Sequence, residues 1–229
     1  MRKVLHSHWY EPCAASSVAG VARAPRAFHP GIYHLGSHRS DDRNLFLSDG
    51  EREVFLEGLG EVLERFELGL VSYTLMGNHY HLMLRIPDAR VSKALQRLHT
   101  WYSRLHNKLN GRSAHLFRAH FFARELESDD DLLWTARYLA WNPVAAGMAG
   151  HPFTWRWSSA AATAGLAKPA LPLELEPLRA AFDDSPSWRR RYRSFMEQAD
   201  ENDEVIGEKP PVRKSRRPDS NRGPLHYER

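Results

Sequence analysis

The sequence predicts an α+β fold of the ferredoxin-like kind, in which helices pack on an antiparallel sheet. The prediction depends first on the order of the segments, which is strand, helix, strand, strand, helix, one or two strands, helix. It depends second on the turn Gly77-Asn78, which joins two of the strands as an antiparallel hairpin. We expect the helices to lie on one face of this sheet.

The first half of the pattern begins with a strand over residues 28–38, which a polar loop follows. A helix then begins near Ser48, because apolar residues repeat at helical spacing from there with charged residues between them. The next strand spans residues 70–76, and the hairpin turn leads into a strand over residues 78–86. These segments supply three strands and the first helix.

A second long helix follows, with Ser92 as its expected N-cap and Asn110-Gly111 at its end. Its apolar side chains repeat at intervals of three and four residues, which is typical of a helix packed on a core. Residues 116–126 are rich in Phe and predict one or two further strands. These strands complete the predicted sheet.

The last long helix of the pattern begins after Ser128, with Asp131 in the position that completes a capping box. We expect this helix to end at Asn142, because Pro143 cannot continue its hydrogen bonds. Residues 173–198 predict one or two further helices.

Changes in composition predict the domain boundaries. Residues 23–165 contain the predicted sheet and form the expected main domain, and residues 166–199 form a helical C-terminal extension. Residues 1–22 lack periodicity and predict a disordered extension or a mis-assigned start. Residues 200–229 are polar, charged and rich in proline, so we expect a disordered basic tail.

Composition excludes several classes of protein. The 229 residues contain one cysteine, Cys13, so a disulfide framework and a thiolate metal cluster are excluded, and a cytoplasmic location is expected. No uninterrupted apolar run approaches the roughly 20 residues of a membrane-spanning helix, so no membrane partner is expected.

Positive charge is concentrated in two places. Lys and Arg outnumber Asp and Glu by 32 to 28, and the whole excess comes from residues 210–229. Residues 89–124 contain no acidic residue, which predicts a surface that binds phosphate, with a plain solvated face as the alternative. The cations of this basic block are Arg90, Lys93, Arg97, Arg104, Lys108, Arg112, Arg118 and Arg124.

His79 and His81 have the clearest functional signal. Because side chains alternate along a strand, the two histidines share one face of the strand over residues 78–86, while Tyr80 points to the other. Two imidazoles on one face of a rigid strand are half of a divalent-metal site. From the pair alone, a metal site and two ordinary histidines are equally open.

Tyr138 and Asn142 lie one helical turn apart in the helix that begins after Ser128, so their side chains share one face. The Asn carbonyl oxygen suits Mg²⁺ or Mn²⁺, and a phenol can act as a nucleophile. A tyrosine in a helix is usually a core residue, as expected for Tyr102 in the apolar stripe of its own helix. The pair therefore carries little weight alone.

Three segments together resemble a known family. They are residues 74–82 (TLMGNHYHL), 111–117 (GRSAHLF) and 136–147 (ARYLAWNPVAAG). With the shorter segments 30–34 and 155–159, they look like the single-tyrosine HUH transposases. Within these, they resemble the REP-associated tyrosine transposases, relatives of the smallest bacterial insertion-sequence transposases. The resemblance covers about residues 22–165, in the family's order.

The resemblance implies an HUH endonuclease domain that cleaves single-stranded DNA beside a hairpin and rejoins it, with Mg²⁺ or Mn²⁺ as cofactor. It implies that His79, His81 and Asn142 bind the metal and that Tyr138 attacks phosphorus to give a 5′-phosphotyrosine. The basic block would follow the DNA backbone, and His34, on a neighbouring strand, could support the metal ligands. The implied partner is single-stranded or hairpin DNA with a REP-like palindrome; monomer and homodimer both stay open.

Several positions differ from the family pattern. Gly77 replaces a common proline, Ala119-His120 stands where Gly-Arg is usual, and Phe122 stands where lysine is common. None of these differences removes a catalytic residue, but two of them lower the positive charge near the DNA path. Two alternatives therefore stay open: a DNA-binding regulator of the same fold with weak or no catalysis, and a metal-dependent nuclease that uses water.

Overall fold

The computed structural model describes residues 28–41, 43–113 and 115–198, and the predictions for residues 1–22 and 200–229 lie outside them. None of the helices in these described ranges is long and apolar enough to cross a membrane. The helices and strands, in chain order, are β1 (Gly31–His38), α1 (Asp49–Arg65), β2 (Gly69–Leu75), β3 (His79–Ile86), α2 (Val91–Leu109), β4 (Phe122–Leu126), α3 (Asp129–Ala145), α4 (Ala160–Thr163), α5 (Glu176–Ala180) and α6 (Trp188–Glu197).

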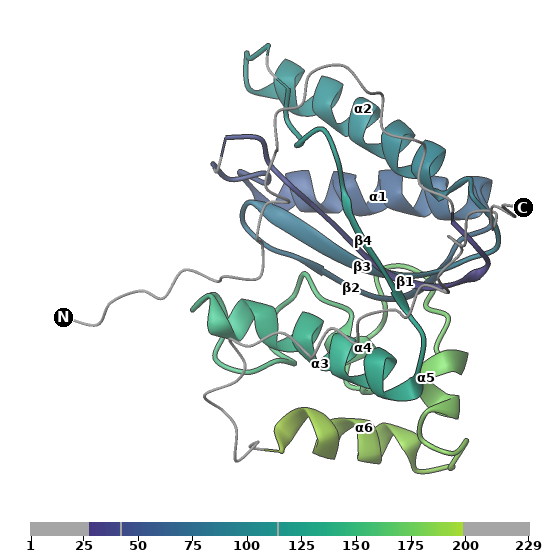
Figure 1. Cartoon of the computed structure of the whole chain (residues 1–229). Coiled ribbons are helices and arrows are strands. Elements are labelled where there is room, and N and C mark those ends of the chain that lie inside the picture. The colour runs from purple at the N-terminus through teal and green to yellow at the C-terminus, as the bar shows by residue number, and fades with distance from the viewer. Residues whose placement is uncertain (1–27, 42, 114, 199–229) are drawn as a thin grey trace, which may run out of the picture. The chain divides into compact units, whose positions relative to one another are not determined.

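The four strands form one antiparallel sheet in the order β2-β3-β1-β4 (Figure 1). Its two inner strands, β3 and β1, are not consecutive in the chain, which is the arrangement of a ferredoxin-like fold and confirms the predicted fold class. β2 and β3 form the predicted hairpin around Gly77-Asn78, closed by a hydrogen bond of 2.9 Å from the Met76 N–H to the His79 carbonyl.

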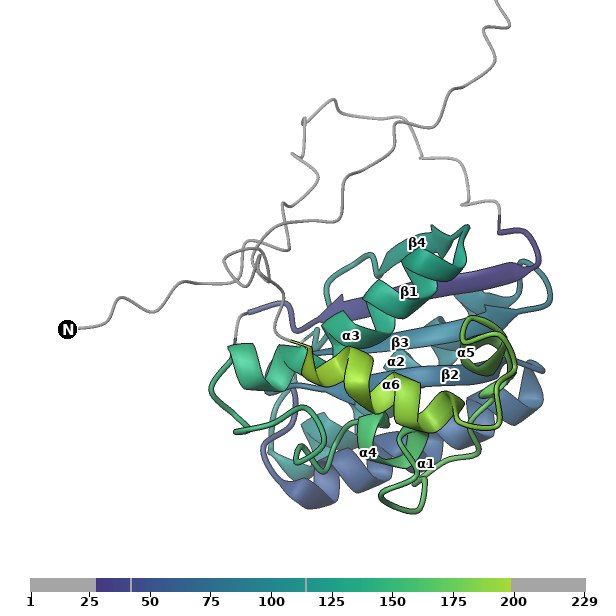
Figure 2. The ribbon, with the colours of Figure 1, turned by 90° about the horizontal axis from the view of Figure 1, so that it is seen from below.

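Helices cover both faces of this sheet. α1 and α2 lie on one face, whereas α3, with α6 beyond it, lies on the other (Figure 1 and Figure 2). The expectation of helices on one face is therefore wrong. The reason is visible in β2, which is buried at every residue, because a strand with buried side chains on both sides needs cover on both sides.

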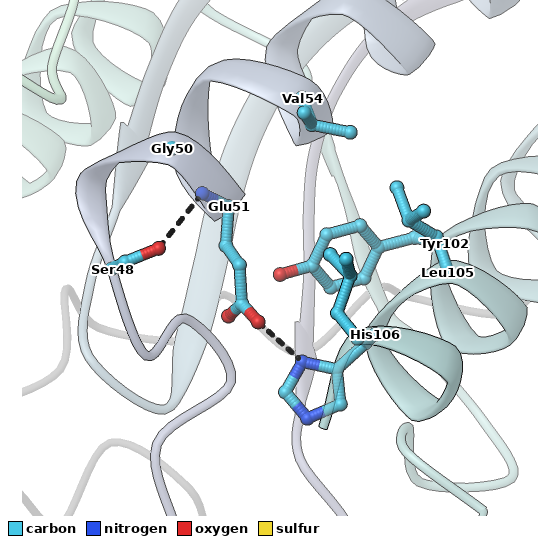
Figure 3. A pocket seen from close by; sticks show the side chains of 8 residues that line it. Ser48, Gly50, Glu51, Val54, Tyr102, Leu105 and His106 are labelled. Carbon is cyan, nitrogen blue, oxygen red and sulfur yellow. Dashed lines mark hydrogen bonds and ion pairs between the residues drawn. The ribbon is translucent and has the colours of Figure 1, made fainter. Parts of the chain in front are cut away.

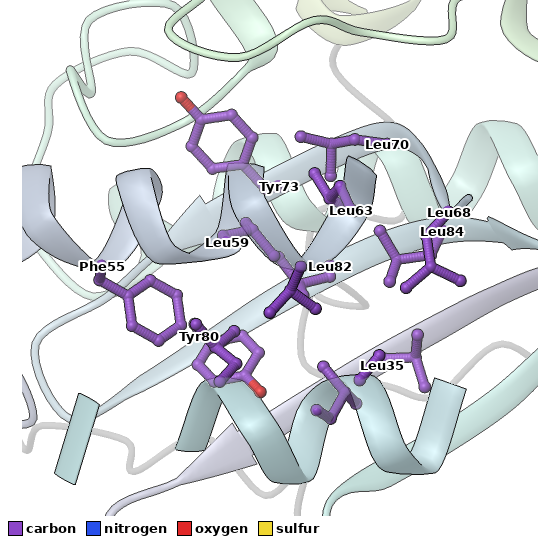
Figure 4. Packing of buried hydrophobic residues seen from close by; sticks show 14 of the residues in the cluster. Leu35, Phe55, Leu59, Leu63, Leu68, Leu70, Tyr73, Tyr80, Leu82 and Leu84 are labelled. Carbon is purple, nitrogen blue, oxygen red and sulfur yellow. The ribbon is translucent and has the colours of Figure 1, made fainter. Parts of the chain in front are cut away.

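The larger core fills the space between the sheet and the pair α1 and α2. Leu35 of β1 and Tyr80, Leu82 and Leu84 of β3 point into it and are fully buried. Figure 4 shows these side chains beside Phe55 of α1, whose ring centroid lies 5.1 Å from that of Tyr80. Tyr80 is thereby held in the core, as predicted, and its neighbours in β3 are turned to the opposite face.

A second core lies on that opposite face, under α3. Val71 and Met83 enter it from the sheet, and Leu139 enters it from α3. Tyr192 and Met196 of α6 belong to the same cluster. The predicted helices of residues 173–198 therefore exist as α5 and α6, and α6 packs on α3 within one continuous core.

The helix start predicted near Ser48 and the N-cap predicted at Ser128 are both confirmed. The Ser48 hydroxyl accepts a hydrogen bond of 3.2 Å from the Glu51 N–H at the start of α1. The Ser128 hydroxyl accepts one of 3.1 Å from the Asp131 N–H at the start of α3. Each of these bonds satisfies one of the backbone donors that a helix start leaves without a partner.

The prediction of Ser92 as the N-cap of α2 is wrong. α2 begins at Val91, so its N-cap residue is Arg90, whose side chain makes no capping bond. The Asp88 carboxylate explains the earlier start, because it accepts a hydrogen bond of 2.8 Å from the Arg90 N–H and turns the chain into the helix.

α3 ends later than predicted. Pro143 lies inside the helix, which continues to Ala145. A proline this close to the end removes one backbone donor but does not stop the turn, and the Ala146 N–H still bonds to the Asn142 carbonyl at 3.0 Å. The helix ends where Gly147 adopts a φ of +69°, a left-handed conformation that glycine accepts without strain.

Candidate active site

The two histidines of β3 lie on the face of the sheet that α3 covers. His79 and His81 alternate with the core residue Tyr80, and the centroids of their rings are 4.9 Å apart. β3 is an inner strand, hydrogen-bonded to β2 on one side and to β1 on the other. The backbone that carries the imidazoles is therefore held on both sides, and the shared face predicted for the pair is confirmed.

His81 is oriented by a third histidine, His34 of β1. The Nε2 atom of His34 lies 3.0 Å from Nδ1 of His81, and both side chains are buried. With His34 as the acceptor, His81 carries its proton on Nδ1 and keeps a lone pair on Nε2. That Nε2 atom is buried and has no hydrogen-bond partner within the described part of the chain. A bound cation would satisfy this lone pair, which is otherwise costly to bury.

His79 has three neighbours at the site. Its Nδ1 lies 2.7 Å from the Asn78 side-chain oxygen, which makes the Nδ1–H group a donor. The side chain of Asn142, from α3, makes a hydrogen bond to His79. The ring of His38, from β1, stacks on that of His79 with the centroids 4.3 Å apart and the planes at 9°. One imidazole of β3 is thus in direct contact with α3.

Tyr138 of α3 packs against the other imidazoles. Its ring centroid lies 5.4 Å from that of His81 and 5.8 Å from that of His34, in edge-to-face contacts. The side chain is half-buried, and Asn142 follows one turn later on the same side of α3. The structure therefore brings together the four residues singled out for the site, His79, His81, Tyr138 and Asn142.

Burial keeps the imidazoles of this cluster neutral. It lowers the pKa of His34 and the pKa of His79 to about 3, and it holds the pKa of His81 well below its usual value. The positive charge of Arg124 lowers the pKa of His34 further, and His38 does the same for His79. Neutral imidazoles offer lone pairs, so near pH 7 the cluster is in the form that binds a cation.

The donor set fits a divalent cation. It consists of two imidazole nitrogens, from His79 and His81, and the amide oxygen of Asn142. In residues 28–41, 43–113 and 115–198, no group of three or more His, Cys, Asp or Glu side chains could hold a metal ion. The amide of Asn142, which bonds to His79, is the group that would complete the set, and the unpartnered Nε2 of His81 supports the fit.

Most of the basic block lies on the opposite face of the sheet from Tyr138. Arg90 forms ion pairs with the carboxylates of Asp88 and Glu67, so its charge is largely neutralised within the protein. The remaining α2 cations are exposed, and the structure of the described ranges gives them no ion pair. These four α2 cations are Lys93, Arg97, Arg104 and Lys108.

Arg124 is the member of the basic block that lies beside the histidines. It is opposite His34 in the pairing of β4 with β1, and its guanidinium binds Asp131 and Thr135, each at 2.9 Å. The other two members, Arg112 and Arg118, lie between α2 and β4. The structure therefore does not gather the eight cations on one surface.

Two neighbours of the site, His38 and Phe122, are not among the site residues expected from the sequence. The ring of Phe122 lies 5.1 Å from that of His34, at a position where the resembling family commonly has lysine. His38 could have been found, because residues 34, 36 and 38 alternate onto one face of β1. Gly36 lies opposite His81 in the register, which aligns that face with the histidines of β3.

A second polar cluster lies on the other face of the sheet, between the start of α1 and the end of α2. Its buried members are Glu51, His106 and Arg39, and the first two line a cavity of about 280 Å³ (Figure 3). The Glu51 carboxylate accepts hydrogen bonds from the Leu47 N–H at 2.6 Å and the Asn110 side chain at 2.8 Å. Because these bonds join the ends of two helices, we assign the cluster a structural role.

Comparisons with known proteins agree with this geometry. Residues 31–143 match the family model described as "Transposase IS200 like". A solved structure described as "Structure of the REP associates tyrosine transposase bound to a REP hairpin" has a similar fold, with a TM-score of 0.53 and 12% sequence identity. The match covers 68% of this chain and 93% of that one. No curated protein matches the sequence at a significant level.

The matched residues contain all of the candidate site, from His34 on β1 to Asn142 on α3. The likeness to the solved structure, at its low identity, supports the fold alone. The family match identifies the kind of domain: residues 31–143 of this chain match the IS200-like transposases.

Proposed function

We propose that this domain cleaves and rejoins single-stranded DNA beside a hairpin, with Tyr138 as the nucleophile and a divalent cation held by His79, His81 and Asn142. The observation that carries the proposal is the convergence of these four side chains from two elements, β3 and α3. The family match supports a transposase role for the same stretch of chain.

The proposed reaction is a transesterification at phosphorus. The phenolic oxygen of Tyr138 loses its proton and bonds to the scissile phosphorus, while the bond to the 3′ oxygen breaks and that oxygen takes up a proton. The products are a 5′-phosphotyrosine and a strand with a free 3′-hydroxyl. Attack by another 3′-hydroxyl in the reverse direction joins the strands and releases Tyr138, so neither water nor an external energy source is needed.

The protein's contribution to the cation site is to orient its ligands. A cation bound by His79, His81 and Asn142 would supply polarisation of the scissile phosphate oxygens. With His34 as the acceptor at Nδ1 of His81 and Asn78 as the acceptor at Nδ1 of His79, Nε2 is the nitrogen of each imidazole that would bind the cation. Imidazole nitrogen suits Mn²⁺ better than Mg²⁺, which makes Mn²⁺ the better probe.

The proposed substrate is hairpin DNA with a single-stranded flank. By its description, the solved structure with the similar fold is bound to a REP hairpin. In this chain, the four α2 cations offer a surface for a phosphate backbone, because their charges are not paired with carboxylates of the described residues.

The direct test is a covalent adduct between protein and DNA. A hairpin oligonucleotide labelled at its 3′ end is incubated with the full-length protein and Mn²⁺, and the products are separated under denaturing conditions. We expect labelled protein with the unchanged chain and none with Tyr138→Phe. Tyr33→Phe is the matched control, because it removes a phenol in the core on the opposite face. An adduct formed by Tyr138→Phe would contradict the proposed nucleophile.

The same assay separates the two alternatives. Cleavage that persists in Tyr138→Phe without an adduct would identify a nuclease that uses water. DNA binding by the unchanged protein with no Mn²⁺-dependent adduct would identify a DNA-binding regulator. The ligand set is tested with Asn142→Ala, expected to lower Mn²⁺ affinity about tenfold or more, and with Asn142→Asp, expected to retain it through a carboxylate oxygen.

A further inference from the structure

The helix α6 lies outside the residues that match the family model, yet it contacts the helix that carries Tyr138. α3 lies between the sheet and α6 (Figure 1 and Figure 2). Two of its side chains, Arg137 and Trp141, reach α6, and each directly precedes a residue of the candidate site, Tyr138 or Asn142. Tyr138 and Asn142 form one stripe on α3, which contacts the histidines. Arg137 and Trp141 form the neighbouring stripe, which contacts α6.

Arg137 binds the end of α6. Its guanidinium donates hydrogen bonds to the backbone carbonyls of Phe195 and Gln198. The last carbonyls of a helix have no partner within the helix and carry the negative end of its dipole, so a cation there is favourable.

The surroundings of Arg137 show that this contact is specific. The side chain is 5% exposed, and it makes no ion pair with a carboxylate of the described residues. The guanidinium lies instead among the rings of Trp134, Trp141 and Phe195, at distances of 5.6 to 6.0 Å from their centroids. A buried cation without a carboxylate is costly, so the carbonyls of α6 are what satisfies it.

Trp141 makes the second contact. Its Nε1–H group donates a hydrogen bond of 2.8 Å to the Met196 carbonyl. The end of α6 is therefore held at three backbone carbonyls by two side chains that lie one turn apart on α3. A pair of contacts one turn apart fixes the rotation of α3 about its axis as well as its distance from α6.

The last turn of α3 needs support from outside because of Pro143. Proline has no N–H group, so the carbonyl of Leu139 loses its helical hydrogen bond in the turn that carries Asn142. Trp141 lies in the same turn, and its bond to α6 restrains the backbone where the internal bond is missing.

We propose that α6 is a clamp that positions Tyr138 and Asn142, with Arg137 and Trp141 as its positioning residues. The inference rests on the proposed function, in which those two side chains must meet His79 and His81 in one geometry. Arg137 and Trp141 act through the backbone of α3: losing either contact lets the last turns of the helix move against the sheet.

The decisive variant is Trp141→Phe in the full-length protein, which keeps an aromatic ring but loses the bond to α6. Trp157→Phe is the matched control, because it loses a Trp N–H bond of 3.0 Å to Asp49 of α1, away from α3. In the metal-free protein we expect hydrogen exchange in residues 139–145 to be about tenfold faster for Trp141→Phe than for the control, as expected for one lost hydrogen bond.

Two kinetic results separate positioning from general stability. At saturating hairpin DNA, the single-turnover rate of adduct formation should fall about tenfold in Trp141→Phe, with the dissociation constant for DNA unchanged. Arg137→Met should act in the same way, and Arg137→Lys should restore part of the rate, because an ammonium group can still bind one carbonyl. If Trp141→Phe and Trp157→Phe lose the same amount of rate, the loss comes from lower global stability, and the clamp is overturned.

The clamp and the proposed function can fail separately. If the unchanged protein forms no adduct, the proposed function fails, and the exchange of residues 139–145 in the metal-free protein still decides on the clamp. If the adduct forms but neither its rate nor the exchange responds to Trp141→Phe and Arg137→Met, the clamp is wrong and the function stands.

Discussion

His34 and His81 lie on neighbouring strands, and their imidazoles are joined by a contact of 3.0 Å between Nε2 of the first and Nδ1 of the second. Both rings are buried on the face that α3 covers. With His34 as the acceptor, the contact places the proton of His81 on Nδ1 and orients its ring. His34 therefore controls a proposed ligand atom, Nε2 of His81, from the opposite side of the same ring.

The first prediction is that His34→Ala lowers the affinity for Mn²⁺ by about 10- to 100-fold, because His81 loses the group that orients it. His34→Gln should lose less, since its side-chain oxygen can accept the same hydrogen bond. Free Mn²⁺ can be measured by electron paramagnetic resonance during a titration. Equal affinities for His34→Ala and the unchanged protein would contradict the role of His34.

The second prediction concerns Gly36, which lies opposite His81 in the sheet. A Cβ atom at this position would lie 3.0 Å from His81 Nδ1 and 3.1 Å from the Tyr80 carbonyl. Gly36→Ala should displace the imidazole and lower Mn²⁺ affinity about tenfold. Gly150→Ala is the control, because a Cβ there meets nothing within 4 Å. The two variants are compared in the same titration, and equal affinities would rule out the displacement.

The third prediction concerns the four α2 cations. Replacing Lys93, Arg97, Arg104 and Lys108 together by alanine should weaken hairpin binding and lower the salt dependence of the binding constant by about 0.9 per lost phosphate contact. Fluorescence anisotropy at several salt concentrations measures both. Arg90→Ala should change neither, since Arg90 is paired with Asp88 and Glu67. An unchanged salt slope in the fourfold variant would place the DNA elsewhere.

The fourth prediction concerns helix capping. Ser128→Ala should lower the free energy of unfolding by about 1 kcal/mol, because the Asp131 N–H loses its acceptor at the start of α3. Ser92→Ala should have little effect, since α2 begins at Val91 without a bond from Ser92. Urea denaturation of both variants gives the comparison. A loss of equal size in Ser92→Ala would mean that the caps are wrongly assigned.

Local signals account for what could be predicted of the fold. The helix start near Ser48, the cap Ser128 and the hairpin around Gly77-Asn78 each depend on residues close together in the chain, and all three are confirmed. The end of α3 was beyond such signals, because Pro143 is tolerated in a last turn that is packed on α6. The start of α2 depends on the Asp88 carboxylate, which competes with Ser92 for the role of cap.

The site residues could be predicted where the repeat of side-chain directions along a single strand or helix determines which residues share a face. His79 and His81 share a face because of strand alternation, and Tyr138 and Asn142 share one because of the helical turn. That the two faces meet depends on α3 crossing to the opposite side of the sheet from α1 and α2, which the segment order alone does not determine. For the same reason, the cations of the basic block are close together in the sequence and predict one surface, but in the structure they lie on both faces of the sheet.

If the proposed substrate contacts both the four α2 cations and Tyr138, their separation by the sheet sets its minimum size. A DNA molecule in contact with both must pass an edge of the sheet and span two layer spacings of about 10 Å each, or roughly 20 Å. At 3.4 Å per base pair this corresponds to about six base pairs. The protein would then act as a ruler: shorter hairpins could occupy one face, but they could not bind α2 and reach the tyrosine at the same time.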